Sequence, residues 1–230
     1  MKVIGLLGGM SWESTALYYR SINEAVKKEL GGLHSAKLVL YSVDFHEIEQ
    51  LQATGEWQKA GALLADAARA LEQAGADFIV LCTNTMHKVA QQITGAVDIP
   101  LLHIADATAS RIQATGLRKV GLLATRFTME QDFYKGRLEQ GYGLEVIVPY
   151  EDDRHIVHRI IYEELCQGII REESRAQYRQ ILTRLKDQGA EAVILGCTEI
   201  TLLVTESDSP LPLFDTTAIH AEDAVLNALR

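Results

Sequence analysis

Three short segments of this 230-residue chain occur twice, in the same order and at nearly constant spacing. The matching pairs are IGLL at Ile4–Leu7 with VGLL at Val120–Leu123, GADFIVL at Gly75–Leu81 with GAEAVIL at Gly189–Leu195, and, more loosely, IPLLHIADAT from Ile99 with LPLFDTTAIH from Leu211. The offsets are 116, 114 and 112 residues. Three matches in register indicate a duplication, and the chain is long enough for two small domains with cores of their own.

The repeated segments are short apolar runs that alternate with longer amphipathic stretches, as in an α/β fold. Residues 57–74 and 174–188 have alanine, leucine and charged residues at helical spacing. Strands are expected at Val3–Leu7, Leu38–Val43, Phe78–Leu81, Lys119–Leu123, Leu144–Val148 and Ala192–Leu195. Because these runs lack polar alternation, they predict parallel sheets covered by helices on both faces.

We therefore expect two pseudo-symmetric, Rossmann-like α/β domains, each with a small parallel sheet. The first domain should comprise residues 1–108 plus 216–230, and the second residues 109–215. A final helix from about Thr217 should cross back to the first domain. Ligands of such sheets bind beyond the carboxyl ends of the strands, so we expect the active site in a cleft between the two domains.

Composition and charge exclude several classes of function. A net charge of −9 gives no electrostatic support for binding nucleic acid or an anionic membrane. Three cysteines, with no CxxC spacing, argue against a disulfide framework and for a reduced compartment, with the cytoplasm as the default. The histidines form no zinc-binding pattern. The acidic run at Glu151–Arg154 is expected to be a solvated loop.

Two reactive side chains occupy equivalent positions in the two halves. Thr83 lies eight residues after Gly75, and Cys197 lies eight residues after Gly189, each at the end of a predicted strand. Inverting a carbon centre without redox chemistry requires a base on one face and an acid on the other. A thiol can take part when neighbouring backbone N–H groups stabilise its thiolate.

Four ordered motifs resemble the aspartate/glutamate racemase family, most closely its bacterial branch acting on L-aspartate and L-glutamate. They are GGMSWEST at Gly8–Thr15, CTNTMH at Cys82–His87, TRFTM at Thr125–Met129 and GCTEI at Gly196–Ile200. The resemblance covers essentially the whole chain. It implies racemisation of an acidic amino acid without pyridoxal phosphate, metal or any other cofactor, by two catalytic residues that flank the α-carbon. It also makes a homodimer plausible.

The chain departs from the family pattern at one position. The family usually has Cys-Asn-Thr in the first half, where this chain has Thr83, Asn84 and Thr85. Thr83 could act directly or through water. Cys82 could reach the site instead, although neighbouring strand residues point to opposite faces. Alternatively, catalysis could proceed well only from the Cys197 side. We favour Thr83 as the partner and expect modest, asymmetric rates.

The substrate-binding residues predicted from the loops and the resemblance are Met10, Gln52, Thr83, Asn84, Thr85, Thr125, Thr128, Thr198 and Glu199. Gln52 is expected in the loop after the second strand. Arg126, His46 and Gln52 are candidates to bind the distal carboxylate. Glu199 either orients Cys197 or begins a helix. His87 and His103 are expected to have structural roles or to lie behind the substrate-contacting residues, and not to be catalytic. Cys166 is expected to be a core residue or a bystander.

Other functions remain open at this point. A related maleate isomerase or decarboxylase would also use cysteines in a duplicated cleft. A catalytically weak protein that binds an acidic metabolite is a second alternative, suggested by the threonine at position 83. A thiol hydrolase would need a histidine near a cysteine, and the spacing selects neither His87 nor His220.

Overall fold

A computed structural model describes all residues, 1–230, and the chain divides into two compact units. The first comprises Met1–Ile104 with His220–Arg230, and the second comprises Ala105–Ile219. No helix combines the length and apolar character needed to cross a membrane. Each unit contains a four-stranded, fully parallel sheet, in the order β2-β1-β3-β4 or β6-β5-β7-β8. The α/β fold predicted from the repeats is thereby confirmed.

The elements of the first unit are β1 (Ile4–Gly8), α1 (Trp12–Leu30), β2 (Leu38–Ser42), α2 (Phe45–Ala53), α3 (Trp57–Gln73), β3 (Phe78–Leu81), the 3₁₀ helix η1 (Thr85–Val89), α4 (Ala90–Thr94) and β4 (Leu101–Leu102). Those that follow are α5 (Ile104–Ala114), β5 (Lys119–Leu123), α6 (Arg126–Glu130), α7 (Lys135–Tyr142), β6 (Glu145–Ile147), α8 (Glu151–Glu163), η2 (Leu165–Gln167), α9 (Glu172–Asp187), β7 (Ala192–Leu195), α10 (Ile200–Leu203), η3 (Glu206–Asp208), β8 (Leu213–Asp215) and α11 (Thr216–Leu229). The six predicted strands are present, with every end within one residue of its expected position.

The register of the sheets confirms the internal repeat. Ile4 pairs with Phe78 in the first sheet, and Val120 pairs with Ala192 in the second. These two pairs are separated by the same offsets that the sequence repeats show. The strand orders also correspond one to one, so β3 and β7 occupy equivalent central positions.

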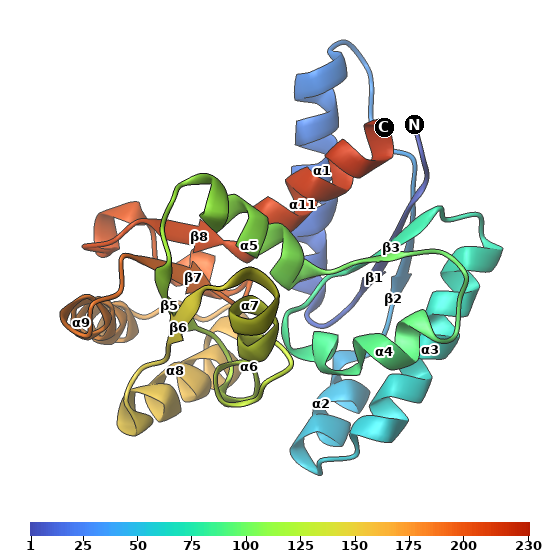
Figure 1. The fold of residues 1–230 in the computed structure, drawn as a ribbon. Helices are drawn as coiled ribbons and strands as arrows, with labels where there is room; N and C mark the ends of the chain where they lie inside the picture. Colours follow the sequence, from blue (N-terminus) through green and yellow to red (C-terminus); the bar gives the residue numbers. More distant parts are fainter. The chain divides into compact units, whose positions relative to one another are not determined.

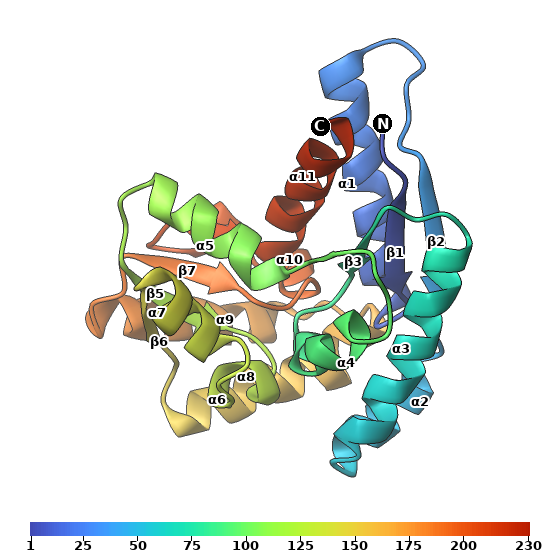
Figure 2. The ribbon, with the colours of Figure 1, turned by 45° about the vertical axis from the view of Figure 1, so that its right-hand side comes forward.

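The first sheet is covered on both faces. One face packs against α1 and the C-terminal part of α11, which lie side by side in both ribbon views (Figures 1 and 2). Its strand residues include Ile4, Leu6, Phe78 and Val80. The other face packs against α2, α3 and α4. Because successive strand residues point to opposite faces, the apolar runs of β1 and β3 supply both cores.

The second sheet is also covered on both faces, with α5 on one side and α8 and α9 on the other in both views (Figures 1 and 2). Helix α9 turns its buried residues toward the sheet, and a Cβ at Gly121 of β5 would lie 3.0 Å from Leu185. A salt bridge between Arg137 and Asp106 joins α7 to α5. The β7 segment, like β3, is therefore buried along its whole length.

The expectation of a solvated loop at Glu151–Arg154 is wrong, because these residues begin α8. Three acidic side chains in the first turn interact favourably with the positive end of the helix dipole. Asp153 is buried and accepts two hydrogen bonds from Arg184 on α9, both 2.7 Å long. The acidic run is thus a helix start that joins two helices.

Candidate active site

The loop after β1 requires glycine at two successive positions. A Cβ at Gly8 would lie 2.4 Å from Thr15, and a Cβ at Gly9 would lie 2.2 Å from the Val43 carbonyl oxygen. Gly9 also has a φ of +96°, which side-chain-bearing residues rarely adopt. Its N–H donates to Thr15 Oγ1 at 2.8 Å, while Ser11 caps α1. The GGMSWEST motif therefore forms a tight strand-to-helix turn at the carboxyl end of β1.

Thr83 lies at the carboxyl end of the central strand β3 and is half-buried. Its carbonyl oxygen is 2.8 Å from Nδ1 of His87, and Nε2 of that ring is 3.3 Å from the N–H of Ile104. A carbonyl only accepts and an N–H only donates, so His87 is the neutral tautomer with its proton on Nδ1. The ring thereby joins the ends of β3 and β4 beneath Thr83.

Cys82 points away from the loop that carries Thr83. Its side chain is fully buried in the core between the first sheet, α1 and α11. Burial raises the pKa of the thiol well above its usual range. Its sulfur is 3.6 Å from the carbonyl oxygen of Val80, the preceding residue on the same face. These features argue against Cys82 as the acid/base group.

A second buried histidine lies near His87. Nε2 of His220 is 2.9 Å from the Leu102 carbonyl oxygen and Nδ1 is 2.8 Å from the Tyr18 hydroxyl. The carbonyl fixes the proton on Nε2, so Nδ1 accepts from Tyr18. Burial lowers the pKa of His220 to about 4, so this ring is neutral at pH 7. The rings of His87 and His103 are 4.4 Å apart, which places three imidazoles behind the β3 and β4 ends.

Cys197 occupies the equivalent position after β7. The Gly196 N–H continues the ladder to Leu123 at 2.7 Å, as the Cys82 N–H does to Leu7 at 2.9 Å. A Cβ at Gly196 would lie 3.0 Å from Ala124, so this position has little room for a side chain. The two loops are thus aligned residue for residue, with Thr83 matched to Cys197.

The Cys197 thiol donates to a carboxylate two residues away. Sγ is 2.9 Å from Oε2 of Glu199, and the Thr198 hydroxyl is 2.7 Å from the same oxygen. All three side chains are buried. Burial, followed by the charge of Glu199, raises the pKa of Cys197 well above its ordinary value. The thiol is therefore protonated at rest, with an acceptor for its proton already in contact.

The surroundings of Cys197 contain further ionisable groups. Tyr178 on α9 is fully buried, and the hydroxyl lies 3.5 Å from the Val157 carbonyl oxygen. Burial raises its pKa, and the charges of Cys197, Glu164 and Cys166 act in the same direction. Cys166, which is half-buried in η2, likewise contributes to the raised pKa of Cys197. A backbone hydrogen bond from Glu199 acts in the opposite direction and lowers the pKa of Cys197, but burial and the neighbouring charges outweigh it.

Thr125 and Thr128 form the loop after β5. Thr125 caps α6, with its Oγ1 3.4 Å from the Thr128 N–H and 3.2 Å from the Thr128 hydroxyl. Both residues are buried, while Arg126 between them is exposed. The Arg126 N–H donates to Nδ1 of His158 at 3.3 Å. The second unit thus presents a cation at the carboxyl end of the inner strand β5.

Most of the predicted binding residues lie near the carboxyl ends of strands within their own unit. Met10, Asn84 and Thr85 are buried after β1 and β3, and Met10 packs in the core beside α2 and α3. The expected loop position of Gln52 is wrong, because this residue is in α2, buried, with Nε2 3.0 Å from the Met86 sulfur. His46 lies on the exposed side of the same helix.

Sequence reasoning missed several residues in contact with the predicted ones. Thr15 fixes the β1 loop, Ile104 bonds to His87, and Tyr178 lies behind Cys197. The Thr15 hydroxyl donates to the Ser11 carbonyl oxygen four residues earlier, a spacing that GGMSWEST contains, so Thr15 had a local signal. The other two had none, because each lies more than ten residues from the group it serves.

Comparisons with known proteins agree along the whole chain. The profile of the Asp/Glu/Hydantoin racemase family matches residues 7–224. The chain is 27% identical over 233 residues to the broad specificity amino-acid racemase RacX of Bacillus subtilis strain 168, covering 97% of this chain and 96% of that protein.

Solved structures of several proteins are also similar to this chain. A Yersinia pestis protein described provisionally as an Asp/Glu racemase has a TM-score of 0.93 and 62% identity, with both chains covered completely. PH1733, an aspartate racemase homologue from Pyrococcus horikoshii OT3, has a TM-score of 0.86 and 37% identity, again over 100% of both chains. A Francisella tularensis glutamate racemase, at 18% identity and a TM-score of 0.70 over 99% of this chain and 81% of that one, shares the fold.

Proposed function

Because this chain belongs to the Asp/Glu/Hydantoin racemase family, we propose that it interconverts the enantiomers of aspartate or glutamate by direct proton transfer at the α-carbon, without a cofactor. Thr83 and Cys197 are the two acid/base groups, one for each face of that carbon. The observation that carries the proposal is their equivalence: each follows an inner strand, β3 or β7, which holds the same position in its sheet. An amino-acid racemase needs two such groups of opposite role.

The contact between Cys197 and Glu199 supplies one half of the reaction. The thiol passes its proton to the Glu199 carboxylate and, as thiolate, accepts the α-proton from the enantiomer that faces it. Because the pKa of the thiol is raised, the thiolate is scarce at rest and this step is slow. In the opposite direction the resting thiol is already the proton donor.

Thr83 supplies the other half through its hydroxyl. An alcohol is a far weaker acid than a thiol, so Thr83 gives or takes a proton with a water molecule as relay. His87 holds the backbone of Thr83 and thereby fixes where the hydroxyl lies. We expect the enantiomer that faces Cys197 to lose its α-proton faster than the one that faces Thr83.

An acidic substrate requires local donors, because the chain as a whole carries a net charge of −9. We assign the α-carboxylate to the polar side chains and N–H groups of the strand-end loops, which include Asn84, Thr85, Thr125, Thr128 and Thr198. Gln52 and Met10 are proposed to contact the substrate from the first unit. Arg126 is the proposed cation for the distal carboxylate. The charge of an arginine suits a carboxylate partner.

Enantiomer-resolved α-proton exchange in D₂O tests the proposal. Cys197→Ser should abolish racemisation and the exchange of the enantiomer that faces Cys197, whereas Cys166→Ser, which changes a second thiol of the same unit, should preserve both. Replacing Arg126 with Gln should raise KM for aspartate and glutamate with a smaller effect on kcat. Racemisation that survives in Cys197→Ser, or unchanged exchange of both enantiomers, would exclude the thiol mechanism. No exchange in the intact protein with either amino acid would exclude the racemase.

A further inference from the structure

The cation proposed for the distal carboxylate lies on a very short helix. Arg126 is the first residue of α6, which has five residues, and its side chain is exposed and forms no salt bridge within the chain. The first N–H groups of a helix have no partner inside the helix, and so short a helix has few bonds to hold its own ends. The place of the Arg126 backbone therefore depends on contacts from other elements.

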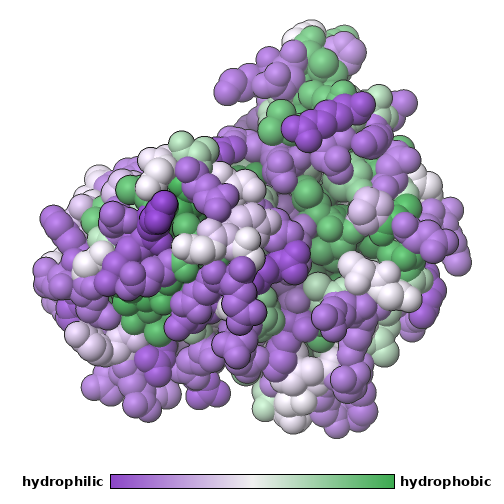
Figure 3. Space-filling view, in the orientation of Figure 1, coloured by the Kyte–Doolittle hydropathy of each residue, from purple (hydrophilic) through white to green (hydrophobic).

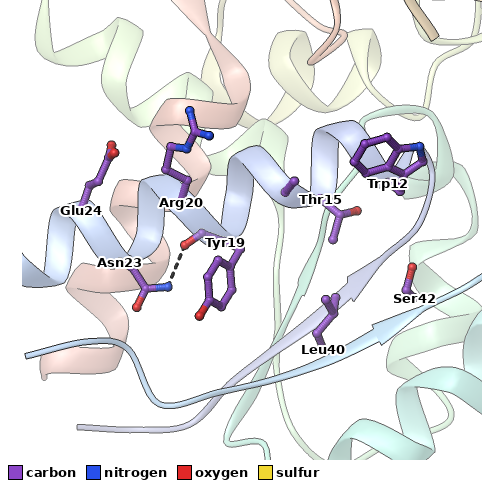
Figure 4. Close-up of a pocket in the computed structure, with 9 residues that line it drawn as sticks. Trp12, Thr15, Tyr19, Arg20, Asn23, Glu24, Leu40 and Ser42 are labelled. Carbon is purple, nitrogen blue, oxygen red and sulfur yellow. Dashed lines mark hydrogen bonds between the residues drawn. The ribbon is translucent and has the colours of Figure 1, made fainter. Parts of the chain in front are cut away.

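An arginine of the first unit is less suited to the same carboxylate. Arg20 on α1 is also exposed and forms no salt bridge, but Glu24 lies one turn away on the same side of α1 (Figure 4). The adjoining groove of about 670 Å³ is lined mainly by apolar side chains, which include Tyr19 and Leu40. Figure 3 shows hydrophobic atoms at the end of α1 and mainly hydrophilic atoms over α6 and α8. A dicarboxylate at Arg20 would thus meet a carboxylate and apolar surface.

Helix α8 holds α6 at both ends. At the start of α6, the Arg126 N–H donates to Nδ1 of His158 at 3.3 Å. At its end, Nε of Arg154 donates to the Glu130 carboxylate at 2.9 Å. The Thr125 cap accepts a later N–H of α6 and leaves the first one to α8. His158 is thus the side chain that accepts the first N–H of this helix.

The His158 ring is held by aromatic contacts and is an acceptor at pH 7. The Phe127 ring meets it edge-on, with centroids 5.8 Å apart, and the Tyr162 ring lies 4.8 Å away. Because the Arg126 N–H only donates, Nδ1 of His158 carries no proton and the neutral tautomer has its proton on Nε2. Burial, followed by the charge of Arg126, lowers the pKa of His158. The contacts and the protonation state both favour the bond to Arg126.

We propose that His158 is a positioning residue for recognition of the distal carboxylate, because it fixes the backbone from which the Arg126 guanidinium reaches that group. This role rests on the proposed function, in which Arg126 is the cation. An arginine side chain is long and flexible, and a fixed backbone limits the positions that its planar fork can take. The ordering cost of a two-bond contact with a carboxylate is then smaller. His158 itself is assigned no contact with the substrate.

Steady-state racemisation by matched variants tests this role. His158→Phe retains the aromatic contacts and loses the acceptor, so KM for aspartate and glutamate should rise about fivefold with kcat within about twofold, the effect of one lost hydrogen bond. His158→Asn places an amide oxygen near the position of Nδ1 and should restore KM to within about twofold of wild type. His155→Phe makes the same change at an exposed position of the same helix and should leave both constants unchanged.

A double-mutant cycle separates the effect of His158 from that of Arg126. In the Arg126→Gln background, His158→Phe should cause no further rise in KM, because its effect passes through the guanidinium. If Arg126→Gln raises KM but His158→Phe does not, or if the two effects add, His158 has no positioning role and the proposed function stands. If Arg126→Gln leaves KM unchanged, Arg126 is not the distal cation and the role of His158 falls with it.

The bond can also be observed without substrate. Nitrogen NMR of wild type at pH 7 should show Nδ1 of His158 without a proton and Nε2 with one. The Arg126 amide should exchange slowly with solvent in wild type and in His158→Asn, and rapidly in His158→Phe. A proton on Nδ1 of His158 at pH 7, or equally rapid exchange of the Arg126 amide in all three proteins, would overturn the proposal.

Discussion

The hydrogen bonds of His87 allow a matched test of how Thr83 is held. His87→Asn retains a donor near the position of Nδ1, facing the Thr83 carbonyl, and loses the acceptor for the Ile104 N–H. His87→Gln retains an acceptor near the position of Nε2 and loses the donor to Thr83. Each variant loses one of the two bonds. We therefore expect nearly equal losses in unfolding free energy, about 1 kcal/mol each.

Only one of the two variants should affect the chemistry on the Thr83 side. A displacement of about 1 Å in a reacting group can lower a rate about a hundredfold. We expect His87→Gln to slow α-proton exchange of the enantiomer that faces Thr83 by about that factor, with less effect on the other enantiomer. His87→Asn should keep both rates within about threefold of wild type, since the Thr83 contact that sets the geometry survives.

The assay is exchange in D₂O followed by NMR for each enantiomer separately, with thermal unfolding measured on the same samples. A loss of about 1 kcal/mol corresponds to a Tm decrease of about 2–4 °C in a chain of this size. Equal slowing of both enantiomers in both variants would show that His87 acts only through stability. Unchanged rates in His87→Gln would show that the bond to Thr83 has no part in catalysis.

Four other variants test three separate parts of the structure. Cys82→Ala should retain α-proton exchange and lose about 1 kcal/mol of stability, typical of a small core change; loss of exchange in a folded variant would reinstate Cys82 as the acid/base group. Because the pKa of His220 falls from 6.5 in the unfolded chain to about 4 in the fold, unfolding takes up a proton between these pH values. Stability should therefore fall by about 3 kcal/mol as pH drops from about 6.5 to 4, and denaturant titrations of His220→Gln should lack this component. Gly9→Ala meets both a positive φ and the Val43 carbonyl oxygen, whereas Gly75→Ala meets only a positive φ of +90°. Unfolding experiments should show a loss of about 1–2 kcal/mol at Gly75 and a larger one at Gly9, and equal losses would contradict the close contact.

The fold was predictable because its signals are local and repeated. Buried parallel strands are continuous apolar runs, and each run occurs twice, so β1 and β5 or β3 and β7 support one another's assignment. The acidic run at Glu151–Arg154 was misassigned because its signals conflict. Charge suggested a loop, whereas the helix dipole and the distant partner Arg184 stabilise a helix start.

The candidate site was predictable only in part. The rule that ligands bind at the carboxyl ends of strands located Thr83 and Cys197, and the short spacing to Glu199 made its contact with Cys197 foreseeable. The bond from Ile104 to His87 spans seventeen residues and depends on how β4 ends beside β3. No pattern in the sequence contains that information, because it arises from tertiary packing.

The measurement that tests the central proposal most directly is α-proton exchange in D₂O with L- and D-aspartate and L- and D-glutamate offered separately. The account predicts exchange with at least one amino acid and a bias toward one enantiomer. The exchange of that faster enantiomer should be lost in Cys197→Ser but not in Cys166→Ser. Absence of exchange with all four compounds, in a protein that is folded, would contradict it.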